Sequence, residues 1–266
     1  MGAGHGRGPA TGMHARLFVP GSSVVHRIDP TVKLLGVLAL VIVVAVTPGD
    51  AWPVFAAAAS AVAAVAAVAR LRPGMLLARL SPVVPFLGLA AITPFVSGGT
   101  RTSIDLGWFT LGVSHEGAAA GAAIAIRVLL GGAATSVLAA TTPVPEIVRA
   151  LTRLRVPAVV VAIFGFMVRF VDVLADELAR MRRAMVARCH DPRWLWHIRP
   201  VATSVGTLFV RSYERGERVH HAMVARGFTG AMPDLDDRPG TSGIHRALAF
   251  APAAVTAAAL AAWSLA

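Results

Sequence analysis

The chain has 266 residues, of which 56% are hydrophobic and 15% charged, and its mean hydropathy is +0.67. Soluble domains contain about 45–50% apolar and about 25% charged residues, so this composition excludes an ordinary soluble protein and indicates an integral membrane protein. A net charge of +11 would suit a nucleic-acid partner, but the arginines lie among apolar segments without a basic-aromatic stripe. No nucleic acid is therefore expected, and the collection of arginine in cytoplasmic loops explains the charge better.

The first part of the chain combines a polar tail with three apolar segments. Residues 1–30 are rich in Gly, His, Pro and Arg and are predicted to form an N-terminal tail. The apolar run from Leu34 to Val46 is short for a bilayer, but Lys33 can extend it by snorkelling. A cleaved signal peptide is disfavoured, because the polar region before this run is long and no Ala-x-Ala site follows. Further spans are predicted at Ala51 to Ala69 and Leu80 to Val96, the latter bent by three prolines: Pro82, Pro85 and Pro94.

A polar loop then leads into a fourth span. Residues 102–113 are predicted to form a short hairpin, and Ala118 to Ala140 a membrane helix that contains Arg127. A charge inside a span is costly and often functional, so Arg127 is a candidate intramembrane functional residue. Snorkelling, or a bond to a neighbouring helix, would explain it as well.

Two long helices are predicted before the last span. The apolar run Ala158 to Val168 has basic clusters on both sides, and a spanning helix would place one of them outside the cell, against the positive-inside rule. Residues 157–187 are therefore interpreted as a helix docked at the cytoplasmic membrane face. A second helix is predicted from about Pro200 to Ala225, and a final span from Ala247 to Ala266.

The predicted fold is an all-α polytopic membrane protein with about five transmembrane helices. Its expected parts are a tail at residues 1–30, a four-span membrane domain at 31–141, a cytoplasmic helical coupling domain at 142–244 and a last transmembrane helix at 245–266. The alternation of basic and arginine-poor loops places the N-terminus in the cytoplasm of a prokaryotic cell, with the chain in the inner (plasma) membrane.

The pentapeptide AMVAR occurs twice, at residues 184–188 and 222–226, at the predicted end of each long helix. One interpretation is helix capping: arginine favours the negative end of the helix dipole, and Gly227 is a natural residue after a helix end. The other is docking, in which two helices ending side by side present two arginines to a pair of similar receptor sites.

Several segments together resemble the transmembrane (T) component of energy-coupling factor transporters, and most closely its cobalt-transport branch, CbiQ. The resemblance covers residues 18 to about 230. It starts at PGSSVVHRIDPTVKLL and includes HEG at His115 to Gly117 and LRVPAVVVAIFGFMVRFVDVLADE. The longest and most specific match is LFVRSYERGERVHHAMVARGFTG, Leu208 to Gly230.

The resemblance implies an energy-coupling subunit of an importer, with cobalt or nickel as the expected substrate. Two cytoplasmic ATPase subunits and a membrane substrate-binding subunit, similar to CbiM, would be its partners. Each ATPase would hold one arginine-containing motif, here Ala187-Arg188-Cys189 and Ala225-Arg226-Gly227. The first departs from the family pattern, because cysteine replaces glycine. A shared T component for a vitamin importer is the alternative.

No catalytic residue, metal site or cofactor is expected in this chain. Lys33 is the only lysine, and no glycine-rich loop precedes it, so a P-loop is excluded and ATP would be bound by the partners. A membrane metalloenzyme would need clustered ligands, but no HExxH motif occurs. The candidates, His190-Asp191, His220-His221 and Asp234, Asp236 and Asp237, do not form a recognised pattern. A channel or secondary transporter, with Arg127 acting in transport, is a further alternative.

Overall fold

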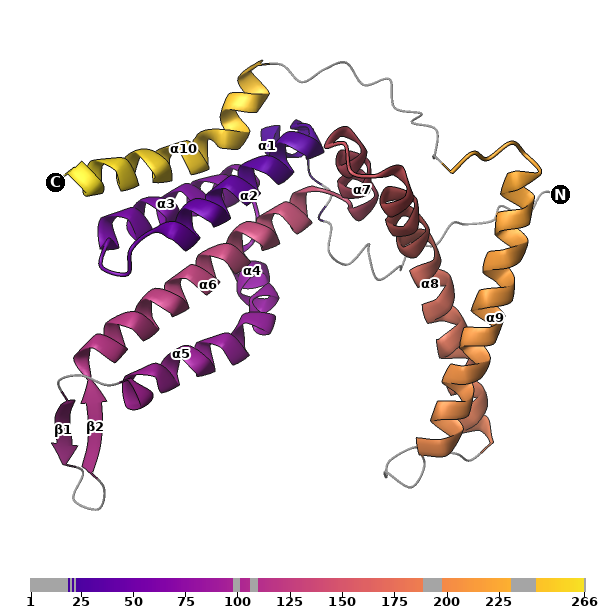
Figure 1. Ribbon diagram of the computed structural model, residues 1–266, viewed down its shortest axis with the longest axis horizontal. Coiled ribbons are helices and arrows are strands. Elements are labelled where there is room, and N and C mark those ends of the chain that lie inside the picture. Colours follow the sequence, from indigo (N-terminus) through magenta and orange to yellow (C-terminus); the bar gives the residue numbers. More distant parts are fainter. Residues whose placement is uncertain are drawn as a thin grey trace. The chain divides into compact units, whose positions relative to one another are not determined.

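The computed structural model describes residues 19, 21, 23–97, 101–105, 110–188, 198–230 and 243–265 (Figure 1). The chain divides into two compact units. The first, called the membrane unit, comprises the described residues of Leu17–Pro143 and Pro239–Ala266. The second, called the hairpin unit, comprises those of Val144–Arg238.

The membrane unit contains α1 (Val24–Arg27), α2 (Pro30–Val46), α3 (Trp52–Val68), α4 (Pro73–Arg79), a 3-10 turn (Ser81–Val83), α5 (Val84–Val96), β1 (Arg101–Asp105), β2 (Thr110–Ser114), α6 (His115–Thr141) and α10 (Gly243–Leu265). The hairpin unit contains α7 (Val144–Arg153), α8 (Ala158–Ala187) and α9 (Ile198–Val224).

These elements confirm the predicted helical class. The predicted polar hairpin is present, with β1 and β2 antiparallel and Ile104 opposite Leu111. The prolines of the third apolar segment interrupt it as expected: α4 gives way to the 3-10 turn that contains Pro82, and α5 follows with Pro94 inside it. The predicted N-terminal tail lies largely outside the described residues.

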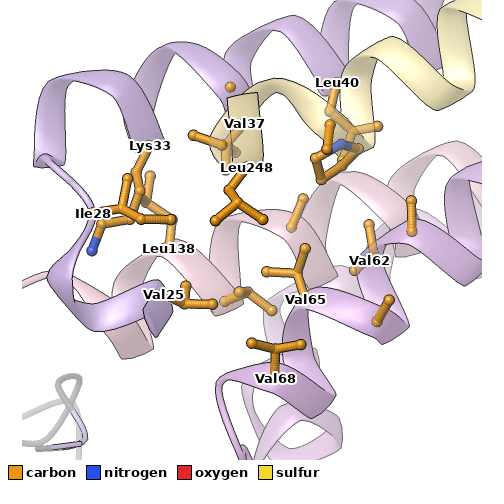
Figure 2. Close-up of a pocket in the computed structure, with 18 of the residues that line it drawn as sticks. Val25, Ile28, Lys33, Val37, Leu40, Val62, Val65, Val68, Leu138 and Leu248 are labelled. Carbon is orange, nitrogen blue, oxygen red and sulfur yellow. The ribbon is translucent and has the colours of Figure 1, made fainter. Parts of the chain in front are cut away.

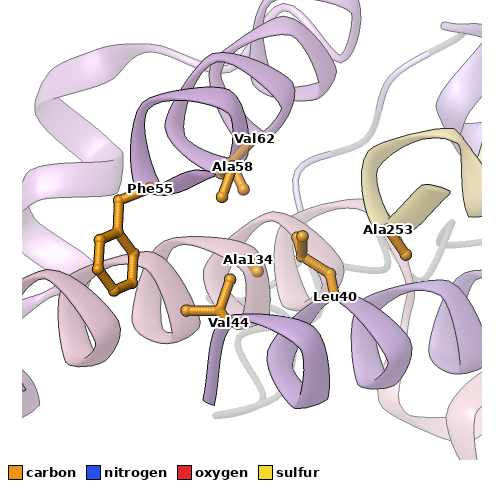
Figure 3. Packing of buried hydrophobic residues seen from close by; sticks show 7 residues of the cluster. All are labelled: Leu40, Val44, Phe55, Ala58, Val62, Ala134 and Ala253. Carbon is orange, nitrogen blue, oxygen red and sulfur yellow. The ribbon is translucent and has the colours of Figure 1, made fainter. Parts of the chain in front are cut away.

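The core of the membrane unit lies where α2, α3, α6 and α10 meet. Figure 3 shows its side chains, which come from all four helices: Leu40, Val44, Phe55, Ala58, Val62, Ala134 and Ala253. Several of these residues are alanines, so the helix backbones approach closely. In lipid, where no hydrophobic force drives helices together, such close contact is a principal source of association.

Glycines mark the closest helix crossings. A Cβ at Gly36 of α2 would lie 2.3 Å from the carbonyl oxygen of Ala249 in α10, and one at Gly121 of α6 would lie 2.5 Å from that of Ala90 in α5. One turn earlier, a Cβ at Gly117 would lie 2.9 Å from another α5 carbonyl. Gly117 and Gly121 thus form a GxxxG pair against α5, the spacing that lets two helices touch along their backbones.

The outer surface of the membrane unit is apolar as well. On α5, Phe86, Leu89 and Ile92 are 55%, 65% and 53% exposed. Exposed apolar area of this kind would be costly in water and is expected next to lipid. Four helical segments of the described chain are long and apolar enough to cross a membrane: Pro73–Val96, α6, α8 and α10. Helices α2 and α3 are apolar but have 17 residues each, about 26 Å of helix.

Helix α8 meets the length and composition of a span, whereas the charge pattern predicts that it lies at the cytoplasmic face. Arg169 and Asp172 follow its apolar first part, and Arg180, Arg182 and Arg183 lie just before its last turn. The positive-inside rule predicts that both ends of α8 face the cytoplasm.

Cysteine labelling separates these two placements. Thr152 and Arg183 are exposed and lie on opposite sides of the apolar part of α8. We expect single cysteines at these positions, with Cys189 replaced, both to resist a membrane-impermeant thiol reagent applied outside intact cells and both to react after permeabilisation. Labelling of only one of them from outside would show that α8 spans the membrane.

Candidate functional site

Helices α8 and α9 form an antiparallel pair. Glu177 of α8 accepts hydrogen bonds from Arg180 of its own helix and from Arg211 Nη1 of α9, the latter at 3.0 Å. Nearer the end of α8, Ser204 Oγ of α9 lies 3.5 Å from Met185 Sδ. As residue numbers rise along α8, those of its contacts on α9 fall, so the two helices run in opposite directions (Figure 1).

The end of α9 has a complete C-terminal capping motif. Gly227 has φ +83°, its N–H donates to Val224 O at 2.9 Å, and the N–H of Phe228 donates to Met223 O at 3.0 Å. These two bonds define a Schellman motif with Gly227 directly after the cap. The predicted role of Gly227 in ending the helix is confirmed, and Arg226 occupies the C-cap position itself.

The end of α8 places its arginine at the same position. Arg188 is the C-cap of α8, with φ −92° and ψ 22°, and its N–H donates to Ala184 O and Met185 O at 3.3 and 3.1 Å. Cys189, the third residue of the predicted motif, lies outside the described residues. The two copies of AMVAR therefore end their helices in equivalent positions.

Both C-cap arginines are exposed, as are Ala187 and Ala225 beside them. Within the described part of the chain, neither guanidinium forms a hydrogen bond or an ion pair. Both remain able to bind a carboxylate or several carbonyl groups through their planar donor set. Glu214 and Arg218 form an i,i+4 ion pair at 3.9 Å, so an arginine elsewhere on α9 does have an intramolecular partner.

The expectation that the two helices end side by side is wrong. Because α8 and α9 are antiparallel, Arg188 lies near the start of α9, whereas Arg226 lies at its far end. Helix α9 has 27 residues, and a rise of 1.5 Å per residue separates the two arginines by about 40 Å along the pair. The α8–α9 pair thus has one exposed arginine at each of its two ends.

Arg127 bonds to a neighbouring helix, one of the alternatives considered for it. Its Nη2 donates to the carbonyl of Thr47 at 2.6 Å, and Thr47 is the C-cap of α2. Its guanidinium carbon also lies 5.7 Å from the ring centre of Phe55 in α3. The positive charge therefore stabilises the negative end of α2 and connects three helices. This geometry favours a packing role for Arg127.

Lys33 does not snorkel to a surface as predicted. It is 6% exposed, and its Nζ donates to the carbonyl of Thr141, the last residue of α6, at 3.2 Å. The sequence carried a signal for this burial: Lys33, Gly36, Leu40 and Val44 recur at helical spacing and form the buried face of α2. The prediction considered Lys33 by itself and did not include the buried face of α2 to which it belongs.

Other candidate groups give no site in the described structure. His190, Asp191 and the three aspartates at 234, 236 and 237 lie outside the described residues. The rings of His220 and His221 are 6.0 Å apart on α9. Among the described residues, no three His, Cys, Asp or Glu side chains are placed to hold a metal ion.

An apolar, closely packed helical bundle together with a hairpin of long, partly basic helices defines a polytopic helical membrane protein. Comparison with protein families identifies which one: residues 21–235 match the family model described as cobalt transport protein CbiQ. The chain therefore belongs to the CbiQ family, as its resemblance indicated. The matched range includes α2 to α9 and both AMVAR copies.

Individual relatives agree with this assignment. A cobalt transport protein CbiQ from Rhodobacter capsulatus is 32% identical over 161 residues, 59% of this chain and 66% of that protein. An energy-coupling factor transporter transmembrane protein EcfT from Listeria innocua is 26% identical and covers 80% of this chain and 83% of its own length. A putative fused cobalt transport protein CbiMQ from Methanocorpusculum labreanum is 25% identical, and the match covers 36% of its length. The first and third of these relatives are named as cobalt transport proteins, and the second as the transmembrane protein of a transporter.

Proposed function

We propose that this chain is the energy-coupling membrane subunit of an importer, and that each end of its α8–α9 hairpin docks one cytoplasmic ATPase subunit. The observation that carries the proposal is the pair of exposed arginines, Arg188 and Arg226, which occupy equivalent C-cap positions about 40 Å apart. Two equivalent positions too far apart for one pocket fit two similar subunits. The family assignment supports the same function.

In this mechanism the chain transmits motion and performs no chemistry. ATP binding closes the pair of ATPases, and both ends of the hairpin move with the subunits that hold them. The membrane unit passes the movement to a membrane substrate-binding subunit. The fused CbiMQ relative joins a protein of this kind to a CbiM part, which supports a CbiM-like partner.

Cobalt, or the chemically similar nickel, is the proposed cargo. The family description and the CbiQ-named relative both refer to cobalt. A shared subunit for a vitamin importer is the second candidate, because the EcfT-named relatives match a larger share of this chain. The proposal includes an N-terminus and a hairpin unit on the cytoplasmic side of the plasma membrane, as the positive-inside rule predicts.

Reconstitution in lipid vesicles tests the function. The purified chain alone is expected neither to bind nor to hydrolyse ATP, because its sequence has no P-loop. Together with an ATPase pair and a CbiM-like protein, it is expected to support ATP-dependent cobalt or nickel uptake. Vesicles that lack only this chain are the control.

Three outcomes contradict parts of this proposal. Equal metal uptake without the chain would remove its coupling role. Uptake only with a vitamin-binding subunit would select the second candidate. ATP hydrolysis that co-purifies with the chain itself would refute a non-catalytic subunit.

A further inference from the structure

The last turn of α6 lies directly before a boundary between the two compact units. The chain passes from the membrane unit to the hairpin unit between Pro143 and Val144. Proline disfavours helical conformation in the residue before it, and Thr142 is extended, with φ −138° and ψ 118°. Helix α6 therefore ends at Thr141, and the covalent connection between the two units leaves directly from its last turn.

Two bonds from outside the helix hold this end. The last four carbonyls of a helix have no partner within it. Here Lys33 Nζ donates to Thr141 O at 3.2 Å, and the backbone N–H of Val19 donates to Ala140 O at 3.0 Å. Val19 is itself held, because its carbonyl oxygen lies 3.1 Å from His26 Nε2.

The surroundings of Lys33 strengthen its bond. Figure 2 shows Lys33 beside Ile28 and Leu138, at one end of a cavity of about 330 Å³. The other labelled residues that line this cavity are apolar. Lys33 is 6% and Thr141 2% exposed. In such a low-dielectric environment, a bond between a cation and a carbonyl is stronger than in water. The charge also lies at the negative end of the α6 dipole.

We propose that Lys33 is a positioning residue for energy coupling: it keeps the last turn of α6 intact while the hairpin unit moves. With Lys33 in place, motion of the hairpin unit displaces α6 as a rigid body and so reaches α2 and the rest of the membrane unit. Without Lys33, the same motion unwinds the last turn of α6 and does not reach the rest of the membrane unit. This inference rests on the proposed coupling function.

The test uses the complete transporter in vesicles and measures both ATP hydrolysis and metal uptake. We expect Lys33→Met to retain its ATPase partners and at least half of the hydrolysis rate, while metal taken up per ATP falls at least fivefold. Lys33→Arg retains a cationic donor and is expected to keep most of the coupling. Lys33→Gln has a neutral donor, and its metal uptake per ATP is expected to lie between those of the other two variants. It tests the proposal if Lys33→Met does not fold.

A control on the same helix separates coupling from stability. Gly36→Ala perturbs the contact between α2 and α10 without touching the end of α6, since its Cβ would meet Ala249 O. It is expected to lower the melting temperature and leave uptake per ATP unchanged. Amide hydrogen exchange on the purified chain should show faster exchange at residues 138–142 in Lys33→Met and not in Gly36→Ala.

Two results would overturn the role of Lys33. One is unchanged uptake per ATP in a folded Lys33→Met or Lys33→Gln variant. The other is an equal loss of uptake per ATP in Gly36→Ala. Failure of the proposed function is distinguishable from both, because the unmodified chain would then show no ATP-dependent uptake.

Discussion

Replacing Arg188 and Arg226 together with alanine is expected to release both ATPase subunits, whereas each single replacement releases one. Truncating one partner of a buried, hydrogen-bonded charge pair typically costs about 2–5 kcal/mol, and about 1.4 kcal/mol is a factor of ten in affinity. The two arginines lie about 40 Å apart, so the two losses should add. Lysine should rescue poorly at either position, since it lacks the planar donor fork.

Pull-down of the ATPases, beside a melting curve of the isolated chain, measures this effect. Arg183→Ala is the matched control for Arg188, because it removes another exposed arginine from the same helix. Arg218→Ala serves α9 in the same way. A purely capping role predicts the opposite pattern: a stability loss of about 0.3–1 kcal/mol from the dipole, with full retention of the ATPases. Normal transport by both single variants would show that AMVAR only ends helices well.

Gly121→Ala is expected to destabilise the membrane unit. The added Cβ would lie 2.5 Å from the backbone oxygen of Ala90, which is 4% exposed and cannot move aside as a flexible side chain would. Overpacking of this kind costs about 1–3 kcal/mol. For a chain of this size, that corresponds to a melting temperature lower by roughly 2–12 °C.

Gly131→Ala on the same helix is the control. A Cβ there meets nothing within 4 Å, and alanine is a better helix former than glycine by about 1 kcal/mol. Thermal unfolding in detergent should therefore place Gly131→Ala at or above the unmodified chain and Gly121→Ala below it. Equal melting temperatures for the two variants would show that the crossing of α5 and α6 relaxes without cost.

Much of the element order could be predicted because the chain marks its helix ends clearly. The predicted helices at 157–187 and about 200–225 became Ala158–Ala187 and Ile198–Val224. Pro157 fixes the start of the first, and Gly227 ends the second through its positive φ. Pro82 and Pro94 likewise identified where the third segment departs from a straight helix. These are local properties, and each depends on one or two residues.

The antiparallel direction of α8 and α9 was not predicted, although the length of the connection between them indicates it. Residues 189–197 connect α8 to α9, and nine extended residues reach at most about 32 Å. A parallel arrangement would require a return of about 40 Å along α9, so only antiparallel helices are compatible with this connection. Comparing these two lengths would have placed Arg188 and Arg226 at opposite ends.

Other features depend on packing between distant segments and could not be predicted from one sequence. Lys33 and Thr141 are 108 positions apart, and Arg127 and Thr47 are 80 apart. In both pairs a cation, buried in the case of Lys33 and half-buried in the case of Arg127, meets the carbonyl at the end of another helix. Nothing local identifies which helix end will be nearby, because a backbone carbonyl is present at every position.

A pair of antiparallel helices has an approximate two-fold rotation axis perpendicular to both. This rotation exchanges the end of α8, with residues 184–188, and the end of α9, with residues 222–226. A dimer of identical ATPases has its own two-fold axis. When the two axes coincide, the two AMVAR copies would offer the same contact to both subunits. Under the proposed docking, two identical ATPases would then suffice, and one membrane chain would bind two of them.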